Sequence, residues 1–497
     1  MNQGPIERVV ITGGGTAGWA VAAALAKTMG RLLDITLVES DEIGTVGVGE
    51  STIPTARRFH ELIGVAEDSF VAATRASFKL GILFEDWERI GKTYFHSFGT
   101  TGRSNWLADF HHVWLHARER GFAEDFGDYC LEHRAALAGR FLGGKDTPLN
   151  YAYHLDATAY GRFLRAHAEA LGVTRREGKI AHVRLRSEDG FIAAVALEGG
   201  EEIAGDLFID CTGFRGLLIG DALEVGIEDW SQWLPADRAL AVQTEPVGAP
   251  PPYTRASAHR AGWRWRIPLQ DRVGNGLVYA SEFLSDDEAH AMAAETIEGR
   301  FVTEPRIIRF RAGMRRKTWD RNCVAIGLTG GFVEPLESTS IHLIMVAAIR
   351  LLQAFPFGGI SPAAVDRYNA VAQAELEHIR DFIVLHYHAN RRDEPFWQRA
   401  AAMPIPATLA ARMAAFREAG LAYQDQDELF RVDSWVQVML GQGVTPLTAH
   451  PFARMIPDAD LAKSLAAMAA SIGTAADRLP RHEEYLRTLA PAAVAAG

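Results

Sequence analysis

Cysteine is scarce in this sequence. Only Cys130, Cys211 and Cys323 occur in 497 residues, and no two of them form a Cys-x-x-Cys pair. This spacing argues against a disulfide framework and against a cysteine zinc site. Positive charge is also limited, because 51 Lys and Arg residues stand against 62 Asp and Glu residues, a net charge of −11. An acidic chain disfavours nucleic acid and anionic membranes as partners.

Long apolar runs are absent as well. No stretch offers about 18 consecutive apolar residues, so we expect no membrane span. The first expected strand, Arg8 to Thr12, starts too early in the chain to leave room for a signal peptide. Since the few cysteines fit a reducing compartment, we predict a cytoplasmic protein.

A glycine-rich turn follows the first expected strand. The pattern is Gly13-x-Gly15-x-x-Gly18, and it opens an Ala-rich, helix-favouring stretch that ends at Met29. In such a turn the first glycine permits the tight bend, and the second lets the backbone approach a pyrophosphate. The third lets helix and strand pack closely.

An acidic residue closes the next expected strand, which runs from Asp34 to Glu39. Glu39 lies 21 positions after Gly18, where a carboxylate binds ribose hydroxyls. The helix start at Thr16 and Ala17 would supply N–H groups and the positive end of the helix dipole. The combination predicts a dinucleotide site, and the alternative is a glycine turn between two buried elements.

Three other segments contain residues whose function cannot be inferred from each segment alone. In the run Gly262–Pro268, Trp263 and Trp265 would share one face of a strand that Pro268 ends. Alone, this run indicates only a half-buried aromatic strand. Lys79 lies among apolar residues, but a lone lysine is commonly a surface side chain that buries its stem.

The third segment is Glu337-Ser338-Thr339-Ser340 at an expected helix start. A backbone turn there would present N–H groups to an anion. Alone, Glu337 would be a carboxylate at a helix start, worth about 0.3–1 kcal/mol on the helix dipole.

Together these segments resemble the flavin-dependent halogenases, the tryptophan-halogenase-like family. Agreement with the family extends from about residue 5 to residue 440. It includes Gly47–Pro54, Tyr153–Asp156, Asp210–Arg215 and Trp233–Ala239. Two further segments, Asp206–Gly213 and Val324–Gly331, resemble FAD-contacting segments of aromatic-hydroxylase-type flavoproteins.

The resemblance implies one dinucleotide, FAD, because only one glycine turn has an acidic partner. Reduced FAD would come from a separate NAD(P)H-dependent flavin reductase. With O2 and chloride or bromide it would give hypohalous acid, which a small aromatic substrate would consume. Lys79 matches the family's catalytic lysine and would capture this acid. Glu337 matches the catalytic carboxylate and would stabilise the cationic ring and remove its proton.

The remaining site residues follow from the same resemblance. The halide turn is Thr339 and Ser340, and the gatekeepers that keep substrate off the flavin are Trp263, Trp265 and Pro268. The cofactor contacts are Gly13, Gly15, Thr16, Ala17, Gly18, Glu39, Gly49, Glu50, Val183, Leu328 and Ile341. Candidate substrate-stacking residues, each with plain core packing as the alternative, are Phe95, Phe98, Trp106, Trp435 and Phe452.

We predict no metal site. His112 and His116 share a helical face, but no third ligand with matching spacing follows. The expected fold is α/β, a Rossmann-like FAD-binding fold of the aromatic-hydroxylase type with a mostly helical substrate lobe. The discontinuous FAD-binding domain would comprise residues 1–98 plus 151–355. The substrate lobe would comprise 99–150 plus 356–497, and a homodimer is one possible assembly.

The chain departs from the tryptophan-specific members of the family at two places. Ser340 replaces a glycine after the Ser-Thr of the halide turn, and serine does not readily adopt a positive φ. This predicts an altered turn, with bromide preferred. No Trp follows Trp435, and Tyr485 is the only later Tyr, so the clamp for a free amino acid is missing. We therefore expect an indole or phenol derivative as substrate.

Two other functions compete with halogenation. An FAD-dependent aromatic monooxygenase would hydroxylate its substrate on the same fold. It gives no reason for Lys79, Glu337 and the double tryptophan to occur together. A non-catalytic flavoprotein would bind FAD without halide-dependent turnover.

Overall fold

The computed structural model describes residues 4–44 and 49–489. Internal packing divides the chain into two compact units. Unit 1 comprises Met1–Ala76, Leu155–Pro235 and Arg309–Glu377, and unit 2 comprises Ser77–His154, Ala236–Ile308 and His378–Gly497. These units are defined by packing, whereas the predicted domains were assigned by function. That functional division stays a prediction.

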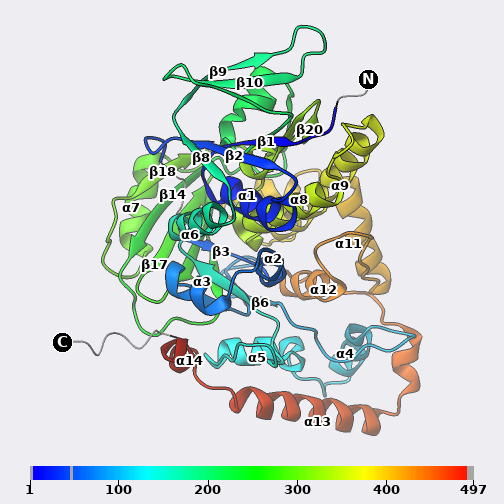
Figure 1. Ribbon diagram of the computed structural model, residues 1–497. Coiled ribbons are helices and arrows are strands. Elements are labelled where there is room, and N and C mark those ends of the chain that lie inside the picture. The colour runs from blue at the N-terminus through cyan, green and yellow to red at the C-terminus, as the bar shows by residue number, and fades with distance from the viewer. Residues whose placement is uncertain (1–3, 45–48, 490–497) are drawn as a thin grey trace, which may run out of the picture. The chain divides into compact units, whose positions relative to one another are not determined.

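A six-stranded sheet forms the core of unit 1 (Figure 1). Its order is β20-β21-β12-β1-β2-β8, and all neighbours are parallel except β20 and β21. β1 (Arg8–Thr12) lies between β12 (Leu207–Asp210) and β2 (Asp34–Glu39). Its last four residues are buried, as expected for a parallel sheet covered on both faces.

Helix α1 (Thr16–Met29) follows β1 and confirms the predicted strand–turn–helix–strand unit. α1 packs against α6 (Ala157–Ala170) and α8 (Ser340–Gln353), as Figure 1 shows. All nine residues from Gly18 to Ala26 are buried, because the small alanine side chains let neighbouring elements pack closely on every side of the helix. The antiparallel strands β9, β10 and β11 form a separate meander.

The other elements of unit 1 follow in chain order. The strands are β3 (Glu50–Ser51), β8 (Thr174–Glu177), β9 (Ile180–Leu185), β10 (Ile192–Leu197), β11 (Glu202–Ala204), β13 (Ile227–Asp229), β19 (Gly313–Arg315), β20 (Trp319–Asp320), β21 (Cys323–Ala325) and β22 (Gly331–Phe332). The helices and helical turns are α2 (Thr55–Ile63), α3 (Glu67–Thr74), η2 (Gly213–Arg215), η3 (Leu217–Ala222), η4 (Gly327–Thr329) and η5 (Pro335–Glu337). α9 (Pro362–His388) begins in unit 1 and ends in unit 2.

A seven-stranded sheet forms the core of unit 2, in the order β18-β14-β17-β16-β15-β5-β6. β16 (Gly262–Pro268) is antiparallel to both β15 (Thr254–His259) and β17 (Val273–Tyr279). The other strands are β4 (Ser77–Lys79), β5 (Gly81–Glu85), β6 (Thr93–Ser97), β7 (Ala152–Leu155), β14 (Arg238–Thr244) and β18 (Arg306–Arg309). β4 and β7 pair in antiparallel fashion outside this sheet.

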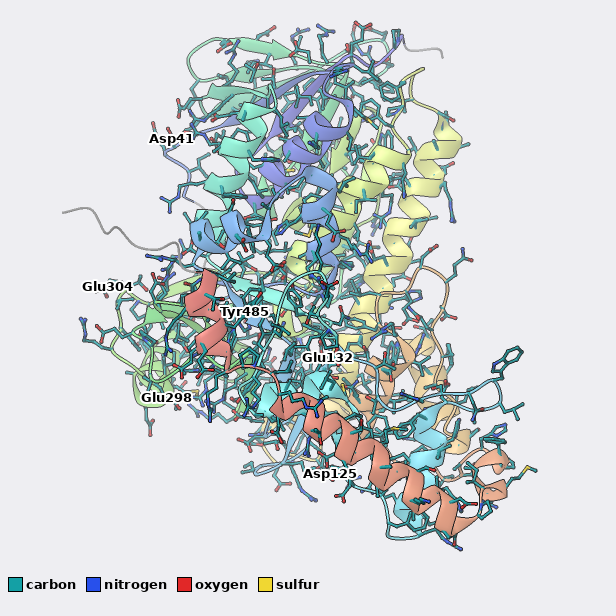
Figure 2. All side chains as sticks on the ribbon, turned by 60° about the horizontal axis from the view of Figure 1, so that its bottom comes forward. Asp41, Asp125, Glu132, Glu298, Glu304 and Tyr485 are labelled. Atoms are coloured by element: carbon teal, nitrogen blue, oxygen red, sulfur yellow. The ribbon has the colours of Figure 1, made fainter. Side chains whose placement is uncertain are left out.

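Helices complete unit 2. They are α4 (Phe110–Glu119), η1 (Phe126–Tyr129), α5 (Leu131–Leu137), α7 (Asp286–Thr296), α10 (Pro395–Ala402), α11 (Ala407–Ala419), α12 (Val432–Gly441), η6 (Pro451–Met455), α13 (Asp458–Asp477) and α14 (His482–Leu489). The long helix α13 runs beside α5 and α4 (Figure 2). The predicted α/β class is confirmed. Within residues 4–44 and 49–489, no helix has the length and apolarity needed to cross a bilayer.

Candidate functional site

Two of the three glycines in the predicted phosphate-binding turn are required by close contacts, and the third faces open space. Gly13 has φ +99°, and a Cβ there would lie 2.3 Å from the carbonyl oxygen of Cys211. A Cβ on Gly18 would lie 1.9 Å from the Gly13 carbonyl. A Cβ on Gly15 would meet no atom within 4 Å, so its backbone faces open space. No side chain caps the start of α1, so its N–H groups can bind an anion there.

Glu39 lies at the end of β2, as predicted. Its carboxylate accepts hydrogen bonds from Arg175 Nε at 2.6 Å and Arg165 Nη1 at 3.3 Å. The Trp19 indole N–H is 3.4 Å from the other carboxylate oxygen. The carboxylate is therefore oriented at the strand end where a ribose would be bound. The open backbone at Gly15, the uncapped helix start and this carboxylate together fit a dinucleotide.

The other predicted cofactor contacts come from separate segments. η4, which contains Leu328, lies against the start of α1, since a Cβ on Gly327 would be 2.9 Å from the Ala17 Cβ. Ile341 is buried in the first turn of α8. Val183, on β9, instead packs against a hydrophobic cluster that includes Ile192 and Val195 of β10.

The segment before α2 is described in part. Gly49 has φ +82°, and burial raises the pKa of Glu50 to about 7. The preceding residues 45–48 lie outside the described part of the chain.

The predicted halide turn precedes α8. Glu337 ends η5 and is buried, Ser338 has φ +61°, and Thr339 is the N-cap of α8. The Thr339 side chain is fully buried, and its hydroxyl has no hydrogen-bond partner among the described residues. The hydroxyl and the uncapped start of α8 are donors suited to an anion.

The structure corrects the reason given for an altered halide turn. Ser340 is the first residue of α8 and has no positive φ. The left-handed residue is Ser338, two positions earlier. Replacing glycine with serine at 340 therefore adds no backbone strain, and the predicted bromide preference loses that support.

Next to the halide turn is a buried histidine that the sequence analysis missed. His342 Nδ1 lies 2.9 Å from Thr55 Oγ1, and its Nε2 lies 3.7 Å from Glu375 Oε1. Glu375 is also paired with Arg350. Burial lowers the pKa of His342 to about 3, so the ring is neutral at physiological pH. No local sequence pattern links these residues, because they come from α2, α8 and α9.

Lys79 ends β4 in unit 2 and is fully buried. The surface-lysine interpretation is therefore wrong. Its Nζ lies 5.2 Å from the centre of the Phe98 ring, within range of a cation–π interaction. Phe98, one of the predicted substrate residues, therefore lies beside the Lys79 amine.

A buried hydrogen-bond chain lies beside Lys79. Ser77 Oγ donates to the Pro268 carbonyl at 2.5 Å and therefore accepts from His154 Nδ1 at 3.1 Å. His154 Nε2 is then the acceptor for the Thr254 hydroxyl at 2.9 Å. Burial, and then the charge of Lys79, keep the pKa of His154 well below its usual value. A neutral imidazole thus connects β4, β7 and β15 to the last residue of β16.

The predicted gatekeepers lie on β16 as expected. Trp263 and Trp265 share one buried face, with ring centres 6.1 Å apart, and Pro268 ends the strand. Trp265 is opposite Gly276, where a Cβ would come within 2.2 Å of the indole. Neither indole N–H has a hydrogen-bond partner within the described ranges.

The other predicted substrate residues have different surroundings. Phe95 packs edge-on against His133 and Tyr253. Trp435 is buried, donates to Glu428 at 3.0 Å and stacks on Arg412, which is typical of a core residue. Trp106 is fully exposed, and Phe452 is half-buried in η6.

The histidines of α4 have protein partners. His111 Nε2 lies 2.7 Å from the Gly420 carbonyl, and His112 Nδ1 accepts from the backbone N–H of His450. Among residues 4–44 and 49–489, no group of three or more His, Cys, Asp or Glu side chains is arranged to hold a metal ion.

Comparison with known proteins identifies the family. The tryptophan halogenase family model matches residues 8–458. The tryptophan 6-halogenase SttH of Streptomyces toxytricini is 34% identical, over 98% of this chain and 99% of its own. The solved structure of Xcc4156, a flavin-dependent halogenase from Xanthomonas campestris, is 54% identical with a TM-score of 0.97, covering 98% of this chain and 99% of that one.

A second solved structure agrees. BrvH, a flavin-dependent halogenase from Brevundimonas sp. BAL3, is 45% identical with a TM-score of 0.93, again covering 98% of this chain and 99% of that one. The family match covers most of the sequence, and the fold and the buried Lys79 agree with it. The chain belongs to the tryptophan halogenase family and is a flavin-dependent halogenase.

Proposed function

We propose that the enzyme halogenates an electron-rich aromatic compound, such as an indole or phenol derivative, by an FADH2-dependent reaction. A separate NAD(P)H-dependent reductase supplies the reduced flavin. Bound FADH2 supplies the two-electron reduction of O2 that turns halide and a proton into hypohalous acid and water, leaving FAD. The hypohalous acid then replaces an aromatic C–H by C–halogen and releases a second water.

Residues of unit 1 hold the flavin and the halide in this proposal. The α1 N-terminus and Gly15 bind the pyrophosphate, and Glu39 binds the ribose. The Thr339 hydroxyl and the first N–H groups of α8 bind the halide. Glu337 accepts the proton that the aromatic ring loses, and its negative charge stabilises the cationic ring before that step.

The buried Lys79 carries the proposal. A protein places a lysine amine in a fully buried position only at substantial cost, so such a site indicates a functional demand. In unit 2 the amine lies against the face of the Phe98 ring. It can hold hypohalous acid by hydrogen bonding, or take up its halogen as a haloamine with release of water. An aromatic substrate stacked near Phe98 would then receive the halogen.

The proposed substrate differs from that in the name of the relative SttH, a tryptophan 6-halogenase. No Trp and a single Tyr follow Trp435 in this chain. We infer that the enzyme lacks side chains to bind the amino and carboxyl groups of free tryptophan. A preference for free tryptophan over indole would overturn this part of the proposal.

The test uses the full-length enzyme with FAD, a flavin reductase, NADH and halide, and offers tryptophan, indole and a phenol panel. We expect halogenated product by mass spectrometry, and loss of at least 1,000-fold in Lys79→Ala with FAD affinity retained. Lys27→Ala, at the far end of α1, serves as the matched lysine control with unchanged turnover. Hydroxylated product would instead support the monooxygenase, and FAD binding without any turnover would support the non-catalytic flavoprotein.

Two finer points belong to the same experiment. Equal chloride and bromide, supplied together, give the halide preference directly, and predominantly chlorinated product would contradict the prediction for bromide. Size measurement of the purified enzyme tests the predicted homodimer.

A further inference from the structure

The opposite face of β16 carries a feature that halogenation does not use. Trp263 and Trp265 occupy one face, so Arg264 and Arg266 project from the other. In the antiparallel register Arg266 lies directly opposite Arg255 on β15, and Arg264 lies opposite Ser257. Like charges placed directly opposite each other destabilise a sheet. The positive charges of three arginines at neighbouring positions on one face therefore require nearby negative charge.

Two of these arginines, Arg255 and Arg264, border a cavity of about 420 Å3 within unit 2. Its floor is formed by β5, β15, β16 and β17, where Leu277 of β17 lies opposite Arg264. Its side is the C-terminal part of α7, which contributes Met292 and Thr296. A smaller pocket lined by Arg264, Arg266 and Glu298 adjoins it. This volume suits a small organic molecule.

The acidic side chains around the cavity are largely committed elsewhere. Glu85 accepts from Arg255 at 3.0 Å and from Ser257 at 2.5 Å. Asp86 accepts from the Gly91 backbone N–H at 2.6 Å. His259, which also lines the cavity, lies 3.1 Å from the Val278 carbonyl through Nε2, and burial lowers its pKa to about 3.

Arg264 and Arg266 are consequently short of negative charge. Arg264 donates one N–H to the Thr296 carbonyl at the end of α7, and no carboxylate lies within 4.0 Å of it among the described residues. Arg266 Nε is buried without a hydrogen-bond partner in the described chain, and the nearest carboxylate, that of Glu298, is 3.9 Å away. Burial lowers the pKa of both guanidinium groups, the direction expected where positive charge lacks compensation.

Glu298 is the exception among the acids, because within the described part of the chain its ion-pair partners are the arginines of this face alone. It lies 3.8 Å from Arg255 and 3.9 Å from Arg266, and about half of its side chain is exposed. It is labelled in Figure 2, in the green segment that follows α7. An exposed carboxylate at this separation is a weak partner that another anion can displace.

We propose that this cavity, together with the small adjoining pocket that Arg266 lines, binds a small organic oxyanion, a carboxylate or phosphate ester, through Arg264 and Arg266. The planar guanidinium fork matches the paired oxygens of both anion types. Leu277 and Met292 would contact the apolar part of the ligand, and Glu298 would leave the arginines as the ligand enters. The site lies on the reverse of the strand that carries the two tryptophans, and it is independent of the proposed halogenation.

The test is calorimetric titration of the full-length enzyme at constant ionic strength, saturated with FAD so that its own phosphate-binding turn is occupied. The probes are inorganic phosphate, phenyl phosphate and benzoate, which distinguish phosphate from carboxylate recognition. We expect saturable binding of at least one organic probe, weakened at least tenfold in both Arg264→Gln and Arg266→Gln. Glu298→Gln should bind about threefold tighter.

Arg260→Gln is the matched control, because Arg260 lies in the turn after β15 and pairs on the surface with Glu288. It should bind like the wild type. Since Arg264 also holds the end of α7, Arg266→Gln decides the result if Arg264→Gln does not fold. Absence of saturable binding, or equal affinity in Arg266→Gln and Arg260→Gln, would overturn the proposal.

Discussion

Thr339→Val separates halide binding from folding at the turn before α8. The wild-type hydroxyl is buried and has no partner among the described residues, which costs a protein about 1–3 kcal/mol. Valine has nearly the same shape and is also β-branched. It removes no cap, because Thr339 makes no side-chain hydrogen bond to α8. In halide-free buffer, Thr339→Val should therefore stabilise the enzyme by about 1 kcal/mol.

The same substitution should weaken the halide site. A hydrogen bond to a charged group contributes about 1.5–3 kcal/mol, and about 1.4 kcal/mol is tenfold in affinity. We expect the halide dissociation constant to rise roughly 10- to 150-fold. Thr339→Val should therefore raise stability and lower halide affinity. General damage to the fold would lower both, so the two explanations can be distinguished.

The assay combines urea unfolding without halide and a bromide titration of turnover. Thr74→Val is the matched control, because Thr74 is equally buried but its hydroxyl donates to the Phe70 carbonyl at 2.8 Å. That variant should lose about 1 kcal/mol of stability and keep the halide affinity. If Thr339→Val is destabilised, or binds bromide as tightly as the wild type, the hydroxyl is not a halide donor and the reasoning fails.

Three further predictions follow from the geometry. Gly13→Ala should reduce folded yield because of its positive φ and the contact with Cys211, whereas Gly15→Ala should fold normally and bind FAD at least tenfold more weakly, as measured by flavin fluorescence. The buried histidines His60, His259 and His342 have pKa values lowered to about 3, so their unfolded forms take up protons first as the pH falls. Stability is then complete above about pH 6.5 and is lost towards pH 3. The free energy of unfolding, measured by urea titration, should fall between pH 7.5 and 5.5 by about 1.4 kcal/mol for each histidine, and a flat profile would contradict this. Ser77→Ala should leave His154 Nδ1 without its acceptor and cost about 1–3 kcal/mol, with FAD affinity unchanged; loss of FAD instead would show that the effect is not local to Lys79.

Local features were accessible from the sequence because short spacings control them. The glycine turn, the acidic end of β2 and the shared face of Trp263 and Trp265 depend on residues a few positions apart, within one or two elements. The backbone period of a strand, or the steric demand of a turn, dictates each of them. The class of fold followed from the same patterns.

Tertiary structure decided what surrounds those residues. Lys79 is chemically the same in a surface strand or a buried one, and only packing in unit 2 places it against Phe98. Ser77 reaches Pro268 across 191 residues, and Thr55 reaches His342 across 287. The prediction of backbone strain at Ser340 was wrong for the same reason. The turn and the helix on either side determine which residue of Glu337–Ser340 adopts a positive φ, and that residue is Ser338. Sequence spacing determines the local backbone geometry of neighbouring residues. The hydrogen-bond partners of a buried polar group depend on the whole chain, because they come from whichever element packs against that group.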